Sequence, residues 1–461
     1  MLTANYNAAT DNNHSSQVPN PASPDANDVR LAVLFWVALA IGLLLSVWYQ
    51  TNQIVDGDQL QMIQRGYEAA YFGYWPATGN AASVVGSVPG FLSTLVVAGP
   101  LMLWDSPYAP VILLLALRLV GFLLIDAVIR EIFPEALAMR VVVVLLLWLN
   151  PWVQYDSLLY NPAYLIFCAG LHLYTAWRMR YDTRFIWTAL HVLAIALAMQ
   201  LHFSWPLLAF VSLYLWWRGL IRVQWWAVLA VVLLALVSLV PYLLALSSNP
   251  EIAHNPDPQA RERYIGWGAV HVYPVLKSVI YWLRYAAWAF PGKLVNDVGF
   301  DWLAQWQWLE VTAVWVWRVV QYGLATITLV VALAANAVAL RVIRGCWRRR
   351  DGEVKPSSTW LLLYAFGAFV AMLISAGLAP LVFNYWHLVL ILPAAIVPLL
   401  VWVHQLAWRG VTFGFLVVVA AILTITNVVA IQDSRKFSWQ ADYATQVNQY
   451  VEQEILVPGR D

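Results

Sequence analysis

The chain has 461 residues, of which 62% are hydrophobic and only 11% are charged, and its formal net charge is +1. A soluble domain carries about 25% charged residues to cover its surface, so the lipid bilayer must be the main solvent of this chain. The near-zero net charge, without a basic face, excludes a nucleic-acid binder. The two cysteines provide no disulfide framework.

Long apolar runs cover most of the chain. Its first 28 residues contain no lysine or arginine, and they predict a disordered cytoplasmic tail rather than a signal peptide. The segment 88–104 is apolar but short, so it either spans the membrane or lies at the interface. The runs that predict membrane-spanning helices are 30–50, 109–129, 136–153, 160–177, 186–202, 203–217, 224–246, 311–340, 358–379, 382–404 and 410–431.

The distribution of lysine and arginine predicts the topology. Arginine-rich loops alternate with loops almost free of basic residues only if 88–104 does not span. The positive-inside rule then places the N-terminus in the cytoplasm and the loop 51–108 outside. We expect an all-α polytopic membrane protein of about eleven transmembrane helices, with juxtamembrane helices in its exterior loops. Its expected parts are a tail (1–28), a first transmembrane module (29–246), a large exterior loop (247–310), C-terminal transmembrane helices (311–431) and an exterior tail (432–461).

Two carboxylates, Asp56 and Asp58, lie directly beyond the first apolar run. A partly desolvated carboxylate near the lipid surface has a raised pKa and serves as a base or binds a metal. The alternative is that the two residues only cap the helix predicted at 59–70, because aspartate before a helix accepts amide hydrogen bonds. The pattern by itself leaves both alternatives open.

Three further exterior segments carry polar residues. Asn150, Gln154, Asp156 and Asn161 gather in the second exterior loop, which is otherwise an ordinary solvated turn. His202 lies in a very short connection, where a structural role is the commoner one for a single histidine. Tyr385 and His387 lie at the start of a late apolar run, and their neighbourhood also fits an interfacial aromatic belt.

Two other sequence features bear on chemistry. Within the run 109–129, Arg118 and Asp126 lie two turns apart, which favours a packing ion pair between them. The chain contains no zinc-binding, EF-hand, P-loop or dinucleotide-binding pattern.

These features in this order resemble the GT-C glycosyltransferases. The branch they resemble most uses phospholipid-linked sugars and includes protein O-mannosyltransferases and lipid A aminoarabinose transferases. That family carries an Asp-Glu pair after its first helix, followed by Gly-Asp-Trp. Here Asp58 and Gln59 precede Gly73, Tyr74 and Trp75, so Gln59 stands where the second acid is usual.

Later motifs extend the resemblance. The family's Thr-Asp-Met-Pro is similar to Tyr160-Asn161-Pro162, with Asp156 upstream as a substitute acid. His202 stands where the family has lysine in Thr-Lys-Gly-Pro, and the family's late Arg-Tyr-Phe-Leu-Pro segment resembles the sequence from Asn384 to His387.

The resemblance implies a GT-C fold and a donor that is a polyprenyl phosphate sugar. Asp58, with Asp56 as the alternate, would be the catalytic base, and these two carboxylates would hold a divalent cation if the enzyme uses one. His202, with Arg261 or Arg263 of the large loop, would stabilise the leaving phosphate. The residues implied to orient the sugar are Asp156, Asn161, Tyr385 and His387.

The implied partners are the lipid-linked donor, the bilayer and an acceptor that is a glycolipid, a polysaccharide or a protein. The implied location is a bacterial inner membrane, with the active site and the C-terminus outside. Two other classes stay open. A lipid-linked polysaccharide ligase or polymerase would rely on Arg and His of the large loop, and a transporter or flippase would carry polar residues at mid-membrane depth.

Overall fold

The computed structural model describes residues 26–82, 86–134, 136–253, 266–267, 270–286, 296–348, 357–379, 383–405 and 413–455. The first half of the chain forms α1 (Ala26–Thr51), α2 (Gly57–Phe72), β1 (Thr78–Ala82), β2 (Gly86–Pro89), α3 (Leu92–Leu103), α4 (Tyr108–Ile132), α5 (Leu137–Val143), η1 (Val144–Trp148), α6 (Pro151–Tyr155), η2 (Asn161–Tyr164), α7 (Leu165–Arg178), α8 (Phe185–Leu201), α9 (Pro206–Trp217), α10 (Trp225–Ser238) and α11 (Val240–Ser248).

The second half continues the helical architecture. It forms η3 (Pro250–Ala253), β3 (Gly266–Trp267), β4 (Val270–His271), α13 (Val272–Ala286), η4 (Asp301–Leu303), α15 (Gln307–Arg348), α16 (Ser357–Leu378), η5 (Tyr385–Ile391), α17 (Leu392–Ala395), α18 (Val397–Gln405), α19 (Phe413–Gln432), β5 (Asp433–Ser434), β6 (Phe437–Ser438), α20 (Tyr443–Tyr450) and η6 (Val451–Ile455).

The expected all-α membrane architecture is confirmed, but the expected number of spans is not. Among the described residues, seven helices are long and apolar enough to cross a membrane, and the pair α10 and α11 adds an eighth if the two form one span bent by 47°. Pro241, in the first turn of α11, has no backbone N–H to continue the hydrogen bonding of α10.

Three expected spans coincide with shorter helices. The helices α7, α8 and α9 have 14, 17 and 12 residues. At about 1.5 Å per residue, each is shorter than the roughly 30 Å of a bilayer's hydrocarbon core. The same holds for α3, which has 12 residues and covers the segment that the charge pattern excluded from spanning.

The helices of the first transmembrane module pack closely through small residues. Gly121 of α4 faces Gly170 of α7, and a Cβ added at Gly170 would lie 2.2 Å from the carbonyl oxygen of Gly121. Such backbone contact is how helices associate in lipid, where apolar burial alone provides no driving force. The contact holds α4 against the segment that carries the second exterior loop.

The buried charges of α4 do not pair as the sequence suggested. The Asp126 carboxylate accepts two hydrogen bonds from Arg140, at 2.9 and 2.7 Å. Arg118 is fully buried and instead donates to the carbonyl oxygens of Val153 (2.5 Å) and Ala163 (3.3 Å). The expected pair of Arg118 and Asp126 is therefore wrong, because the two terminal nitrogens of Arg118 bond backbone carbonyls, which no sequence pattern displays.

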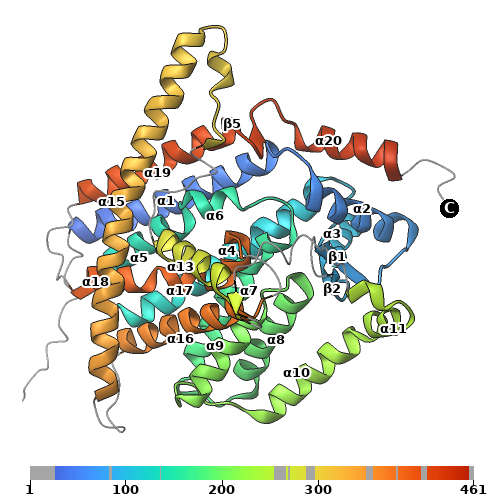
Figure 1. Ribbon diagram of the computed structural model, residues 1–461, viewed down its shortest axis with the longest axis horizontal. Helices are drawn as coiled ribbons and strands as arrows, with labels where there is room; N and C mark the ends of the chain where they lie inside the picture. Colours follow the sequence, from blue (N-terminus) through green and yellow to red (C-terminus); the bar gives the residue numbers. More distant parts are fainter. Residues whose placement is uncertain are drawn as a thin grey trace, which may run out of the picture.

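Short polar elements gather at one end of the helix bundle, which is the end that the charge pattern places outside. Figure 1 shows α2, β1, β2 and α3 together there, with α20 nearby. The helices α2 and α3 lie in the segment expected to form the first exterior loop, and α13 lies in the segment expected to form the large loop. The antiparallel hairpin β5–β6 adds a main-chain bridge between Phe437 and Gln53.

Candidate active site

The two carboxylates of the first exterior loop occupy different environments at the start of α2. Asp56 is the N-cap residue of α2, and both of its carboxylate oxygens accept hydrogen bonds from the Lys436 ammonium, at 2.7 and 3.0 Å. The Asp58 carboxylate makes no hydrogen bond or ion pair within the described part of the chain. Asp56 thus occupies the capping position while its carboxylate pairs with Lys436, and Asp58 is the carboxylate without a partner among the described residues.

Gln59 has a structural role that the sequence did not reveal. Its Oε1 accepts from the Asp56 backbone N–H at 3.4 Å, and its Nε2 donates to Gln53 Oε1 at 2.6 Å. The same Gln53 oxygen accepts from the Leu159 backbone N–H at 3.2 Å. The amide that replaces the usual second acid therefore connects the first exterior loop to the second.

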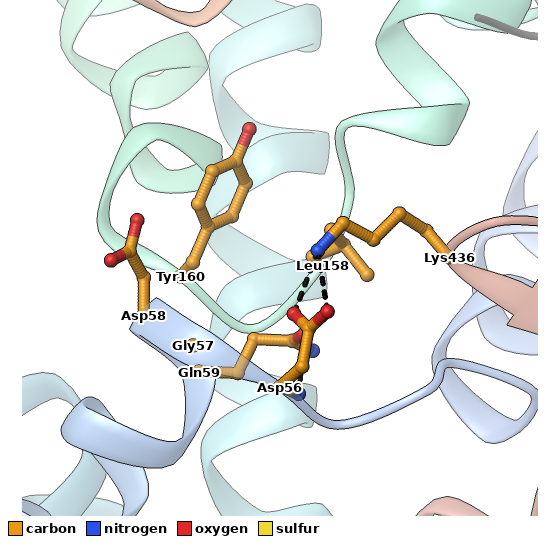
Figure 2. A pocket seen from close by; sticks show the side chains of 7 residues that line it. All are labelled: Asp56, Gly57, Asp58, Gln59, Leu158, Tyr160 and Lys436. Carbon is orange, nitrogen blue, oxygen red and sulfur yellow. Dashed lines mark hydrogen bonds and ion pairs between the residues drawn. The ribbon is translucent and has the colours of Figure 1, made fainter.

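Asp58 borders a cavity of about 300 Å³, which is also lined by Asp56, Gly57, Gln59, Leu158, Tyr160 and Lys436. Figure 2 shows the Asp58 carboxylate on the side of Tyr160, apart from the ion pair between Asp56 and Lys436. Partial desolvation raises the pKa of the Asp58 carboxyl; the Lys436 charge opposes this effect, and the Asp56 charge adds to it. A carboxylate of raised basicity facing an open cavity is suited to accept a proton.

The second exterior loop places a buried carboxylate next to this cavity. The Tyr160 hydroxyl donates to Asp156 Oδ1. Arg118 donates to the Asp156 backbone carbonyl at 3.4 Å. A small space beside Asp156 is also lined by Tyr285 and Tyr385. Asp156 and Tyr385, which are 229 positions apart in the chain, thus line the same small space.

His202 and His387 lie side by side, with ring centroids 5.3 Å apart. The Nδ1 of His202 accepts from the Ser204 backbone N–H at 3.2 Å, and the Nδ1 of His387 accepts from the Asn384 backbone N–H at 3.0 Å. The Nδ1 of His202 also lies 2.8 Å from the Ser204 hydroxyl oxygen. The Nε2 atoms of both rings have no partner among the described residues, and each is a free donor in the tautomer in which Nδ1 accepts. Burial lowers the pKa of His202 to about 4.

Asn161 connects the residues around the Asp58 cavity with His202 and His387. Its side-chain Nδ2 donates to the Leu201 carbonyl at 2.8 Å, directly before His202, while Tyr160 on its other side lines the Asp58 cavity. Stepwise contacts therefore connect the predicted site residues that the structure describes, from the Asp58 cavity through Tyr160 and Asn161 to the two histidines. Arg261 and Arg263 lie outside the described residues.

Two cations of the site were missed by the sequence reasoning. Lys436 comes from the turn of the C-terminal hairpin, and Lys277 of α13 donates to Asn384 Oδ1 at 2.6 Å beside the two histidines. Lysine is scarce in the segments that the charge pattern places outside. This scarcity could have marked Lys277 and Lys436 as candidate site residues. Lys277 also belongs to the large loop, from which a cation was expected.

The carboxylate pair does not fit a divalent cation well. The Lys436 ammonium already pairs with both oxygens of Asp56, so a divalent cation bound there would meet a positive charge. Within the described ranges, no three His, Cys, Asp or Glu side chains lie together as metal ligands.

Comparison with known proteins finds likeness in solved structures only. No protein-family model and no curated protein matches the chain. ArnT from Cupriavidus metallidurans bound to undecaprenyl phosphate matches with a TM-score of 0.50 and 14% identity, over 87% of this chain and 70% of that one. The apo form of that ArnT matches with a TM-score of 0.41 and 15% identity, over 87% and 75%. The first match shows that the chain has an ArnT-like fold, in agreement with the GT-C resemblance.

Proposed function

We propose that the chain is a membrane glycosyltransferase that moves a sugar from a polyprenyl phosphate to an acceptor hydroxyl on the exterior face. One observation supports this proposal most strongly. Asp58, whose carboxylate has no partner among the described residues, borders a cavity near Asp156 and the two histidines in a bundle with an ArnT-like fold. ArnT itself was crystallised with undecaprenyl phosphate, which supports a lipid-phosphate donor for this chain.

In the proposed reaction, Asp58 takes the proton of the acceptor hydroxyl as the hydroxyl oxygen bonds to C1 of the donor sugar. The bond between C1 and the phosphate oxygen breaks at the same time, and its electron pair stays on the phosphate. The raised pKa of Asp58 makes it a stronger base than an ordinary surface carboxylate.

The leaving phosphate needs donors that are already in position. The unpartnered Nε2–H groups of His202 and His387 supply two donors, and the Lys277 ammonium adds positive charge beside them. Such groups stabilise charge that develops in the transition state without having to reorganise. Lys277, like Arg261 and Arg263, belongs to the segment expected to form the large loop.

The sugar itself needs polar groups that fix its orientation. Asp156 and Tyr385 meet beside the cavity, and Asn161 keeps its side-chain oxygen available after its amide nitrogen bonds Leu201. These groups position the reacting atoms, and positioning is a large part of the rate acceleration of bimolecular transfer.

The proposed setting is a bacterial inner membrane, with the N-terminus in the cytoplasm and the catalytic end and C-terminus outside. The acceptor is a glycolipid, a polysaccharide or a protein. Support for this orientation comes from the arginine-rich loops, which the positive-inside rule assigns to the cytoplasm.

The test uses the purified full chain in liposomes with undecaprenyl phosphate carrying a radiolabelled sugar, together with a lipid and glycan extract as acceptor. We expect release of free undecaprenyl phosphate and label on an acceptor. Movement of intact donor between leaflets without release would show a flippase. Transfer only from a diphosphate-linked polysaccharide would show a ligase or polymerase. Either result would contradict the proposal.

A further inference from the structure

The turn of the C-terminal hairpin is held in place by its backbone and not by its charges. The Lys436 carbonyl accepts from the Ile54 N–H at 2.9 Å, and the Ser438 N–H donates to the Asn52 carbonyl at 3.0 Å. Phe437, between them, is fully buried, and its ring packs against Tyr49 with centroids 4.6 Å apart. The position of Lys436 therefore does not depend on its own ion pair.

Residues that follow the hairpin strengthen this attachment. Gln446 of α20 accepts from the Val55 N–H at 3.0 Å and donates to the Gln53 carbonyl at 3.1 Å. Asp433 at the start of the hairpin accepts from the Asp301 N–H at 2.5 Å, which ties it to the end of the large loop. The hairpin, which contributes Lys436 to the lining of the Asp58 cavity, is thus held in a defined position.

At the cavity, the Lys436 ammonium is a hydrogen-bond donor and the adjacent Asp56 carboxylate is an acceptor. The Lys436 ammonium has three N–H groups, and its side chain is 26% exposed, while that of Asp56 is 54% exposed. The ammonium lies 2.7 Å from the carboxylate, so the two groups can bind two neighbouring hydroxyls of one ligand. One hydroxyl accepts a hydrogen bond from the ammonium, and the other donates one to the carboxylate, because a hydroxyl can do either. A hydroxyl near Asp58 would then have a base within reach.

The charge of the cavity excludes an anionic occupant. Asp56 and Asp58 contribute two negative charges and Lys436 one positive charge, so the lining is net negative when Asp58 is ionised. A phosphate would meet repulsion from the carboxylates, whereas a neutral polyol would not. The volume of about 300 Å³ is at the lower end of small-molecule pockets, which fits one sugar ring.

We propose that this cavity is the acceptor site, and that Lys436 and Asp56 bind two neighbouring hydroxyls of a neutral sugar. The inference rests on the proposed glycosyltransferase function and adds the class of acceptor. It assigns the C-terminal hairpin to acceptor recognition and leaves the donor phosphate to His202, His387 and Lys277. Lys436 is a binding residue in this account.

The test measures binding of methyl glucoside, methyl mannoside and methyl galactoside to the full chain in nanodiscs by saturation-transfer NMR. We expect at least one of these neutral glycosides to bind, with affinity reduced about tenfold in Lys436→Met and in Asp56→Asn. Lys436→Arg should retain most of the affinity. The matched control is Arg435→Met, which removes the neighbouring cation of the same turn and should bind as the unaltered chain does.

Three results would overturn the inference. These are no binding of any neutral glycoside, unaltered binding in Lys436→Met, or tighter binding of glucose 6-phosphate than of methyl glucoside. Thermal unfolding of each variant shows whether it is folded. Binding of undecaprenyl phosphate, measured in parallel, should be unchanged in Lys436→Met. Glycoside binding as expected, without sugar transfer by the unaltered chain, would refute the proposed function and leave the sugar site standing.

Discussion

Two pairs of histidines in this molecule have opposite hydrogen-bonding environments. His172 and His191 lie among α7, α8, α9 and α16, with ring centroids 4.1 Å apart. His172 bonds Tyr364 and Ser212, both at 2.8 Å, while His191 bonds Thr175 at 3.0 Å and Ser212 at 2.9 Å. Every ring nitrogen of this pair is satisfied.

His202 and His387 each use only one ring nitrogen: Nδ1 of His202 bonds the hydroxyl and the backbone N–H of Ser204, and Nδ1 of His387 bonds the Asn384 backbone N–H. The carboxylates differ in the same way, since Asp126 is held by Arg140 while Asp58 has no partner in the described segments. A polar side chain in an apolar protein is therefore structural when all its hydrogen bonds are internal. It is available to a ligand when part of its capacity is left unused.

The largest expected effect comes from removing the proposed base. Asp58→Asn should lower the rate of sugar transfer about 100- to 10,000-fold, because the amide cannot accept the acceptor proton. Asp56→Asn keeps the base and should reduce transfer much less. The measurement is release of undecaprenyl phosphate in liposomes. Near-normal transfer by Asp58→Asn would remove Asp58 from the mechanism.

A smaller loss of transfer rate is expected when His202 or His387, each of which has one ring nitrogen without a partner among the described residues, is replaced. His202→Gln and His387→Gln should each slow transfer about 100-fold, since each removes a donor aimed at the leaving phosphate. His404→Gln, on α18 at the end expected to face the cytoplasm, is the matched control and should not change the rate. Equal rates in all three variants would mean that the unused Nε2 atoms have no catalytic role.

Weakening the hydrogen bonds of His172 and His191 should lower the stability of the protein and leave the transfer rate unchanged. Ser212→Ala removes one of the two hydrogen-bond partners of each imidazole ring, at Nε2 in both cases, which should lower the free energy of unfolding by about 2 kcal/mol. The control is Ser375→Ala, because the Ser375 hydroxyl makes no hydrogen bond among the described residues and its loss should be nearly neutral. Thermal unfolding in detergent measures both. A transfer rate that falls in the folded Ser212 variant would contradict the structural role.

The smallest effect is a pH dependence at His202. Its pKa of about 4 in the folded chain, against an ordinary 6.5, means that the unfolded state binds a proton first as pH falls. His202 should therefore cost no stability above pH 6.5 and about 1.4 kcal/mol at pH 5.5. His202→Gln should lose this component of the pH dependence of the melting temperature. An identical pH profile in both chains would show that His202 is not buried as a neutral ring.

Hydropathy and charge predicted the membrane architecture because both are local properties of the chain. The apolar runs 186–202 and 203–217 end within three residues of α8 and α9, but both helices are too short to count as spans, so the error was to take every apolar run as a full crossing. The sequence placed the first and second exterior loops on one face, but it assigned Tyr160, which lines the Asp58 cavity, no role in the site. Lys436 was not foreseen, because a contact across 380 positions with Asp56 depends on how the hairpin folds back.

The central claim is that the exterior end of the bundle is a site of sugar transfer from a lipid phosphate. A structure of the full chain with bound undecaprenyl phosphate tests it most directly. We expect the phosphate within hydrogen-bond distance of the Nε2 atoms of His202 and His387 and near Lys277, with the Asp58 cavity open beside it. A phosphate bound at another place, with these side chains unchanged, would contradict the account.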